Sequence, residues 1–158
     1  MKKTVASKNP IETLRKEHEL VLKTLDKLEA SAEKENLNSL NKNLIFLESE
    51  FNRHSLKKEE KVLFPEIEKF IPREGGPTGV MIMEHKDLVK SMANLSESIK
   101  NNDIENVKRM VSHIVNLLRQ HIAKENDILF MIAEMHFNDK QKKVIMEKFK
   151  KIDLKKHV

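Results

Sequence analysis

The sequence predicts an all-α protein, an up-down-up-down four-helix bundle with an additional short C-terminal helix. The 158 residues include only three Gly and four Pro, and the helix-favouring Leu, Lys and Glu are abundant. Apolar residues recur every three or four positions through four long segments joined by short links. The only segment rich in Gly and Pro, residues 71–77, separates two halves of two helices each. This pattern is typical of a helical bundle.

The first half supplies two amphipathic helices. Asn9-Pro10 predicts the start of the first, because Asn caps a helix and Pro suits its first turn. The second is expected to begin after residues 36–38, to continue with a kink beyond Pro65, and to stop at Ile71-Pro72. The stripe of the first helix comprises Ile11, Leu14, His18, Val21, Leu25 and Leu28. The stripe of the second comprises Leu40, Leu44, Leu47, Phe51 and His54.

The second half repeats this arrangement and adds a short helix. Residues 101–103 break the chain and recap it between the third and fourth helices. The third stripe comprises Met81, His85, Leu88, Met92, Leu95 and Ile99. The fourth comprises Val107, Val111, Ile114, Leu118, His121, Glu125, Ile128 and Ile132. Residues 1–158 are thus expected to form one domain, with the bundle at 10–137 and a helix at 138–156 that docks through Ile145, Phe149 and Ile152.

The composition argues against several classes of function. With no Cys, the chain has no disulfide, thiolate site or iron–sulfur cluster. No apolar run approaches the roughly 18 to 20 residues of a membrane span, and no apolar stretch follows the basic N-terminus, so we expect a cytoplasmic protein without a secretion signal. The net charge of +5 is spread among interleaved acidic residues, which predicts no nucleic-acid surface. Lys142-Lys143 and Lys150-Lys151 leave weak surface binding as an alternative.

Two stretches of the chain repeat one motif. His54-Ser-Leu-Lys-Lys-Glu-Glu-Lys-Val-Leu-Phe and His121-Ile-Ala-Lys-Glu-Asn-Asp-Ile-Leu-Phe each carry a His, then Lys-Glu, then Leu-Phe. A Glu-His pair lies upstream of each, Glu17-His18 and Glu84-His85, and both upstream histidines precede the motif histidine by 36 residues. Each half therefore offers two histidines and one carboxylate, which is what a two-metal site related by a pseudo-two-fold axis requires.

These polar residues occupy core positions of their own apolar stripes. A single buried His is most often a hydrogen-bonded core residue, but here every long helix carries one, and Glu125 accompanies His121. An unpaired ionised carboxylate in a bundle interior costs several kcal/mol, and a cation removes that cost. At ~1.5 Å per residue, the four histidines lie at similar distances from the connections, so they can meet at one depth.

The two motifs differ in the spacing of the carboxylate. His121 and Glu125 are four apart and face the same way. His54 and Glu59 are five apart, about 140° round a straight helix, and Lys58 holds the favoured position although an ammonium is no ligand. We infer a π-bulge that brings Glu59 to the site. Two alternatives remain: Glu60 is the ligand, or both glutamates face solvent.

Other polar residues are weighed by their distance from these positions. His113, His136 and His157 are expected to be non-ligands, because they lie turns away or in the tail. Glu17, Glu50 and Glu84 lie beside ligand positions and are candidates for outer or additional bonds.

The donor set indicates which metal to expect. Four imidazoles and two carboxylates without sulfur suit Fe, Mn or Zn, and structural zinc prefers a closed tetrahedral set that often includes Cys. Six ligands in two equivalent halves fit two ions bridged by two carboxylates. We therefore expect two iron ions, with manganese, zinc or a mixed pair less favoured.

Over roughly residues 10–137 the chain resembles the hemerythrin-like family, the HHE cation-binding domain. The resemblance is carried by Glu17-His18, the His54 motif through Phe64-Pro65, the segment from Ile71 into Glu84-His85, and the His121 motif. It implies a bundle holding a non-haem di-iron centre with an oxo or hydroxo bridge. The implied terminal ligands are His18, His54, His85 and His121, and the implied bridges are Glu59 and Glu125. A His–carboxylate spacing of five also occurs in the family.

The sequence departs from the family at Met81, where oxygen-carrying members have a fifth histidine. The resemblance implies a protein that binds or senses O₂ or a related small molecule, and whether it also catalyses a reaction is open. An alternative is a di-iron peroxidase or a nitric-oxide-handling stress protein. A second alternative is a metal-free helical interaction module. The Cys-bearing N-terminal segment of the relatives that repair iron centres is missing, which argues against that role.

Overall fold

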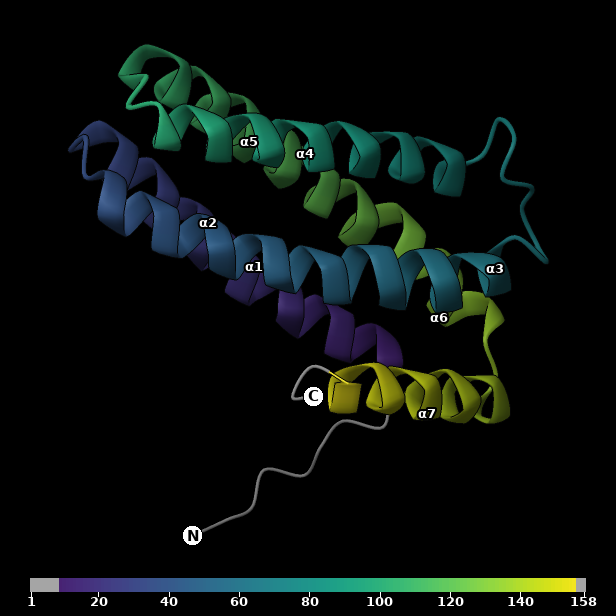
Figure 1. The fold of residues 1–158 in the computed structure, drawn as a ribbon. Coiled ribbons are helices and arrows are strands. Elements are labelled where there is room, and N and C mark those ends of the chain that lie inside the picture. The colour runs from purple at the N-terminus through teal and green to yellow at the C-terminus, as the bar shows by residue number, and fades with distance from the viewer. Residues whose placement is uncertain (1–8, 156–158) are drawn as a thin grey trace, which may run out of the picture.

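The computed structural model describes residues 9–155, and within that range the chain is helical and contains no strand. Some successive elements run directly into one another, the long helical runs lie side by side, and the C-terminal helix packs against the others (Figure 1). They are α1 (Pro10–Glu33), α2 (Leu37–Phe51), π-helix η1 (Asn52–Leu63), α3 (Phe64–Ile67), α4 (Pro77–Lys100), α5 (Ile104–Lys124), π-helix η2 (Glu125–Leu129), α6 (Phe130–His136) and α7 (Asp139–Lys155). Among these described helices, none combines the length and apolar character needed to traverse a bilayer.

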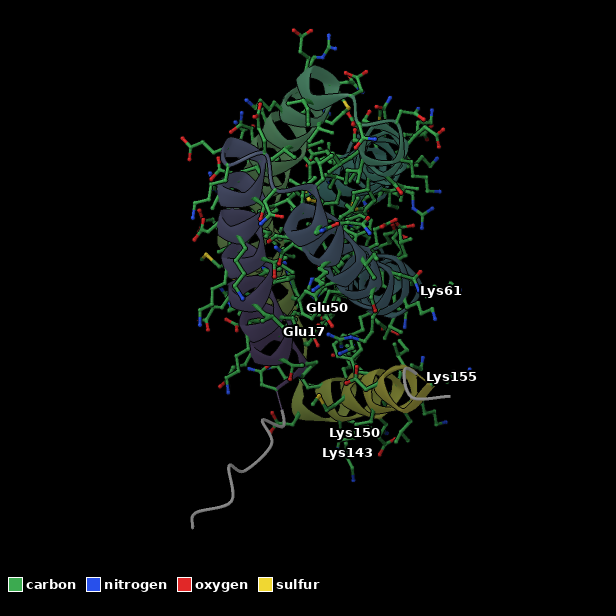
Figure 2. The ribbon with its side chains drawn as sticks, turned by 60° about the vertical axis from the view of Figure 1, so that its left-hand side comes forward. Glu17, Glu50, Lys61, Lys143, Lys150 and Lys155 are labelled. Carbon is green, nitrogen blue, oxygen red and sulfur yellow. The ribbon has the colours of Figure 1, made fainter. Side chains whose placement is uncertain are left out.

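The long helices enclose a shared interior. Helix α1 packs against α2 and α5, and α4 packs against α5 and α2, so each long helix has two long neighbours. Helix α7 packs on the outside of η1 and α1. In the view of Figure 2, Lys143 and Lys150 lie on the face of α7 that points away from the other helices, while Glu17 and Glu50 lie among them. Helix α7 is therefore a cover over one side of the interior.

Two apolar clusters lie on either side of a polar layer. The first contains Val21, Phe51, Leu88 and Leu118, and the second contains Leu14, Leu63, Met81 and Leu129, among others. On every long helix the predicted site residues fall between a residue of the first cluster and one of the second. The fold thus places the six polar side chains between two water-excluding layers.

Helix starts follow the predicted caps, whereas one helix end differs. The side chains of Asn9, Asn36 and Asp103 accept hydrogen bonds from backbone N–H groups in the first turns of α1, α2 and α5. The helix after η1 ends at Ile67 rather than at residue 71, and a turn follows in which Gly75 has φ +73°. Of the predicted C-terminal helix, 139–155 is observed, and residue 156 lies outside the described range.

The predicted π-bulge is confirmed, and a second π-segment was not foreseen. The first, η1, spans 12 residues from Asn52 and includes both His54 and Glu59. The second, η2, begins at Glu125 and changes the helical register after it. The prediction that Ile128 belongs to the core is therefore wrong: it is 51% exposed, whereas Leu129 is 1% exposed. A π-turn takes up one extra residue, so each residue after it reaches the core-facing side one position later in the sequence, and the apolar stripe moves by one position.

Candidate metal centre

The structure brings all six predicted site residues into one buried layer. None is more than 3% exposed, and they come from α1, η1, α4, α5 and η2. They are His18, His54, Glu59, His85, His121 and Glu125. Because the long helices meet at this depth, residues from both halves of the chain face one another.

The six side chains form two overlapping groups. In the His18/His54 group, one atom from each of these histidines and from Glu59 and Glu125 lies within 4.8 Å of the others. In the His85/His121 group, one atom from each of those histidines lies within the same distance of the same two glutamates. Two imidazoles and two carboxylates thus surround each of two positions, and both carboxylates are shared.

Each histidine presents Nε2 to the interior. Nε2 of His18 and Nε2 of His54 are 3.1 Å apart, and the same distance separates Nε2 of His85 from Nε2 of His121. Nε2 of His18 lies 3.0 Å from Glu125 Oε1, and Nε2 of His54 lies 3.1 Å from Glu59 Oε2. Imidazole nitrogens that point inward and lie this close together are typical of ligand atoms arranged around a common metal position.

Two carboxylate oxygens in this layer have no hydrogen-bond partner among the described residues. They are Glu59 Oε1 and Glu125 Oε2, one from each shared carboxylate; both are inaccessible to solvent, and Nε2 of His85 approaches Glu59 Oε1 to 3.3 Å without hydrogen-bond geometry. An orphaned buried acceptor costs about 1–3 kcal/mol, and more when it is charged. A cation between the carboxylates and the imidazoles would satisfy both oxygens, so the residues present fit a two-cation centre.

A second layer of acceptors holds the outward nitrogens of the histidines. Nδ1 of His54 contacts Glu17 at 2.8 Å, and Nδ1 of His121 contacts Glu84 at 2.8 Å. If each Nδ1–H donates to its carboxylate, the lone pair on Nε2 points inward, which is the tautomer that a metal ligand requires. Glu17 and Glu84, predicted as candidates for outer bonds, therefore orient the rings.

The other two histidines are held by residues that follow the shared carboxylates. Nδ1 of His85 contacts Glu60 at 2.6 Å, and Nδ1 of His18 contacts Asn126 at 2.9 Å. Glu60 thus orients a ring and belongs to neither group. The role of Asn126 was missed, although the signal was present: it follows Glu125 as Glu60 follows Glu59, so both residues hold equivalent places in the repeat.

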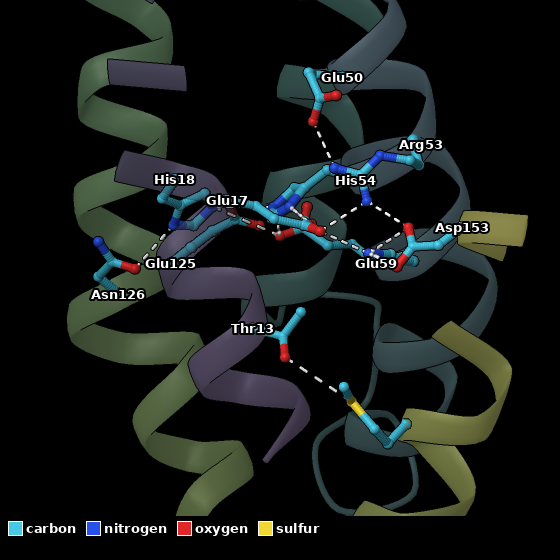
Figure 3. Close-up of polar contacts among 12 residues, drawn as sticks. Thr13, Glu17, His18, Glu50, Arg53, His54, Glu59, Glu125, Asn126 and Asp153 are labelled. Atoms are coloured by element: carbon cyan, nitrogen blue, oxygen red, sulfur yellow. Dashed lines mark hydrogen bonds and ion pairs between the residues drawn. The ribbon is translucent and has the colours of Figure 1, made fainter. Parts of the chain in front are cut away.

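Charged residues beyond the histidines were also missed. Lys58, which was set aside as a non-ligand, is 0% exposed and its Nζ lies 2.6 Å from Glu17. Arg53 contacts Glu17, Glu50 and the α7 residue Asp153, as Figure 3 shows. Glu50, predicted as a candidate for an outer or additional bond, is 2% exposed and pairs with Arg53.

Two of the remaining histidines, His113 and His136, lie away from the layer, as expected. His113 is on the surface, where Nε2 contacts Asp87 at 2.8 Å. The ring of His136 stacks on Phe70 with 4.8 Å between centroids. His157 lies outside the described residues.

Electrostatics in the layer favour paired charges. Burial lowers the pKa of His54, but Glu59 and Glu17 outweigh this effect and raise the pKa to about 10. The same balance, with Glu59 and Glu60 as the partners, raises the pKa of His85 to about 9. Burial raises the pKa of Glu125, but the imidazole of His121 more than offsets this and holds that pKa well below its ordinary value. A bound cation would take the place of the protons on these imidazoles.

The fold and this layer define a class: an all-helical protein with a buried cluster of imidazoles and carboxylates suited to cations. The sequence profile of the hemerythrin HHE cation binding domain matches residues 9–133. The chain therefore belongs to the hemerythrin HHE cation-binding family. No curated protein shows significant similarity to it.

Proposed function

We propose that this protein holds two iron ions and binds or senses O₂ or a related small molecule at them. His18 and His54 would hold one ion, His85 and His121 the other, and both glutamates of the layer would bridge. The observation that carries this proposal is that both groups contain Glu59 and Glu125, each with one buried oxygen lacking a hydrogen-bond partner. The surrounding fold is proposed to be an up-down-up-down four-helix bundle at residues 10–137 with α7 added.

Iron is favoured over other cations by the chemistry of the donors. Imidazole and carboxylate donors suit Fe, Mn and Zn, and no Cys is present to supply the thiolates that many structural zinc sites use. Two iron ions would supply one-electron oxidation and reduction at each ion. The protein would orient the ligand rings through Glu17, Glu60, Glu84 and Asn126.

A small cavity beside the His18/His54 group is a suitable place for the small molecule. Its volume is about 10 Å³, close to the least that holds one water, and its walls include His18, His54, His121 and Glu125. The remaining lining is largely apolar, from Val21, Leu47, Phe51, Leu118 and Ile122. A cavity of this size has room for a molecule of about one or two non-hydrogen atoms and excludes larger substrates.

Peroxide handling is a second candidate, favoured by Glu50. This buried glutamate lines the same cavity and forms an ion pair with Arg53. A carboxylate accepts hydrogen bonds only, so it can bind the O–H of hydrogen peroxide but gains nothing from O₂ or NO. If peroxide is the ligand, Glu50→Leu should reduce the rate of peroxide consumption per bound iron ion.

The proposal is tested by loading the protein with Fe²⁺ without oxygen, measuring iron per chain, and then admitting O₂. Two ions per chain and new near-ultraviolet charge-transfer bands are expected. These bands would be easily seen, because the chain has no Trp or Tyr. Iron near zero per chain with a flat spectrum, and stability that a chelator does not change, would instead support the metal-free helical module.

A further inference from the structure

The two halves of the candidate centre differ in how their outer carboxylates are held. Glu17 and Glu84 occupy equivalent places in the repeat, and each contacts Nδ1 of a motif histidine. Glu84 also accepts from Lys124, whose side chain is 40% exposed. Glu17 accepts from Lys58, whose side chain is fully buried, at 2.6 Å. Lys58 and Lys124 precede the shared carboxylates in the two motifs, so one repeated lysine is buried and the other is solvated.

Helix α7 causes this difference. Asp153 of α7 accepts hydrogen bonds from Lys58 Nζ at 3.1 Å and from Arg53 Nη1 at 2.6 Å. Arg53 Nη1 also lies 2.7 Å from Glu17 Oε2, so two cations join the α7 carboxylate to Glu17. Lys58 Nζ further lies 5.5 Å from the ring centroid of Phe149, a buried residue of α7. A buried ammonium requires such partners, because leaving it unpaired is costly.

A continuous chain of contacts therefore runs from α7 to one imidazole. It passes from Asp153 through Arg53 and Lys58 to Glu17, and from Glu17 Oε1 to His54 Nδ1 (Figure 3). Helix α7 begins at residue 139, beyond the residues 9–133 that match the family profile. The C-terminal helix is thus an addition to the matched region, and among the described residues its Asp153 contacts the two cations that also contact Glu17 in the first half of the centre.

We infer that Asp153 is a positioning residue that makes cation binding in the His18/His54 group, and not in the His85/His121 group, depend on α7. This inference rests on the proposed two-cation function. Without the Asp153 carboxylate, Lys58 and Arg53 lose a shared acceptor and interact more strongly with Glu17. This stronger interaction weakens the hydrogen bond between Glu17 and His54 Nδ1. Loss of a partner bonded directly to a ligand typically lowers metal affinity by about 10–100-fold, and Asp153 acts through Arg53, Lys58 and Glu17, so we expect a loss of about tenfold, at the lower end of that range.

The test is an anaerobic calorimetric titration of the full chain with Fe²⁺. For Asp153→Asn we expect one ion bound as in the unmodified protein and the other bound about tenfold more weakly. Asp153→Glu should restore much of the loss, because it keeps the carboxylate. Glu147→Gln is the matched control, since it removes an exposed carboxylate from the same helix and should change neither affinity. Circular dichroism verifies that the variants retain their helices.

Two backgrounds assign the affected position. In His85→Ala, where the His18/His54 group keeps both of its imidazoles and the other group loses one, adding Asp153→Asn should weaken the ion at the His18/His54 group about tenfold. In His18→Ala the same addition should have less than a roughly twofold effect. Unchanged affinities in Asp153→Asn, or equal losses in both backgrounds as a general loosening would cause, overturn the inference and leave the proposed function standing. No iron bound by the unmodified protein overturns both.

Discussion

Exchanging Glu59 and Glu60 for glutamine, one at a time, separates a shared ligand from a residue that only orients a ring. Glutamine keeps the size of the side chain and removes its charge. Glu59 belongs to both groups and has a buried oxygen without a hydrogen-bond partner. Glu60 is half-exposed and contacts only the outer nitrogen of His85 among the histidines of the layer. The two neighbours therefore differ in role although they are adjacent in sequence.

The structure gives a magnitude for each change. Removing one partner of a buried charge pair costs about 3–5 kcal/mol, which at 1.4 kcal/mol per factor of ten is roughly 140–4,000-fold in affinity. Since Glu59 is within reach of both cation positions, Glu59→Gln should weaken both ions by about this factor. Loss of an outer partner costs about 10–100-fold, so Glu60→Gln should weaken one ion by that smaller amount.

Anaerobic titration with Fe²⁺, combined with metal analysis after gel filtration, measures both variants. Glu59→Gln should emerge with little iron, and Glu60→Gln should retain most of it at saturating concentration. Circular dichroism checks that each variant is folded. A Glu60→Gln protein that loses both ions, or a Glu59→Gln protein that keeps both at full affinity, would refute the assignment of the shared ligand.

Three further outcomes follow from the same geometry. His121→Ala and Glu125→Ala should each cut bound iron sharply, whereas His113→Ala should not, and equal losses in all three would contradict the ligand assignment. Because the pKa values of His54 and His85 are about 10 and 9, each ring carries a proton at pH 7 that iron must displace. Titrations in buffers of different ionisation enthalpy should therefore report proton release, and its absence would argue against ligation by these rings. In the metal-free protein the raised pKa of His54 stabilises the folded state fully below about pH 6.5, and this stabilisation is lost as the pH rises through about 10. The unfolding temperature should therefore fall over that pH window. An unfolding temperature that stays constant across the window would contradict the prediction.

Much of the centre could be predicted because its geometry repeats in the sequence. Equal spacing of 36 residues between paired histidines places them at one depth, and the structure brings all four together. The extra residue between His54 and Glu59 predicted a π-bulge, since only a wider turn lets both side chains face inward. The π-segment at Glu125 was missed because a spacing of four from His121 already satisfies a regular helix. Its effect falls after Glu125, where it exposes Ile128.

The contacts of α7 could not be predicted from periodicity. Ile145 and Phe149 were expected to dock and are buried, but the pattern does not say which surface receives them. The burial of Lys58 depends on that choice, because the same residue on an uncovered helix would be solvated, as Lys124 partly is. Nothing in the sequence distinguishes Asp153 from the other charged residues of its lysine-rich segment, and its role follows only from the packing of α7 on η1.

The ligands of the two cation positions are equivalent, so any difference between the two positions must come from the residues that surround the ligands. Where oxygen-carrying relatives have a fifth histidine this chain has Met81, which is 3% exposed and packs in the second apolar cluster. Each group therefore offers two imidazoles and the same two glutamates. The differences lie around them: the first group borders the small cavity with Glu50 in its wall, and its outer carboxylate is fixed by the buried Lys58. Two ions with matching ligands would thus differ in affinity and in access to a small molecule because of the second layer, so variants of that layer should separate the two ions more cleanly than variants of the shared carboxylates.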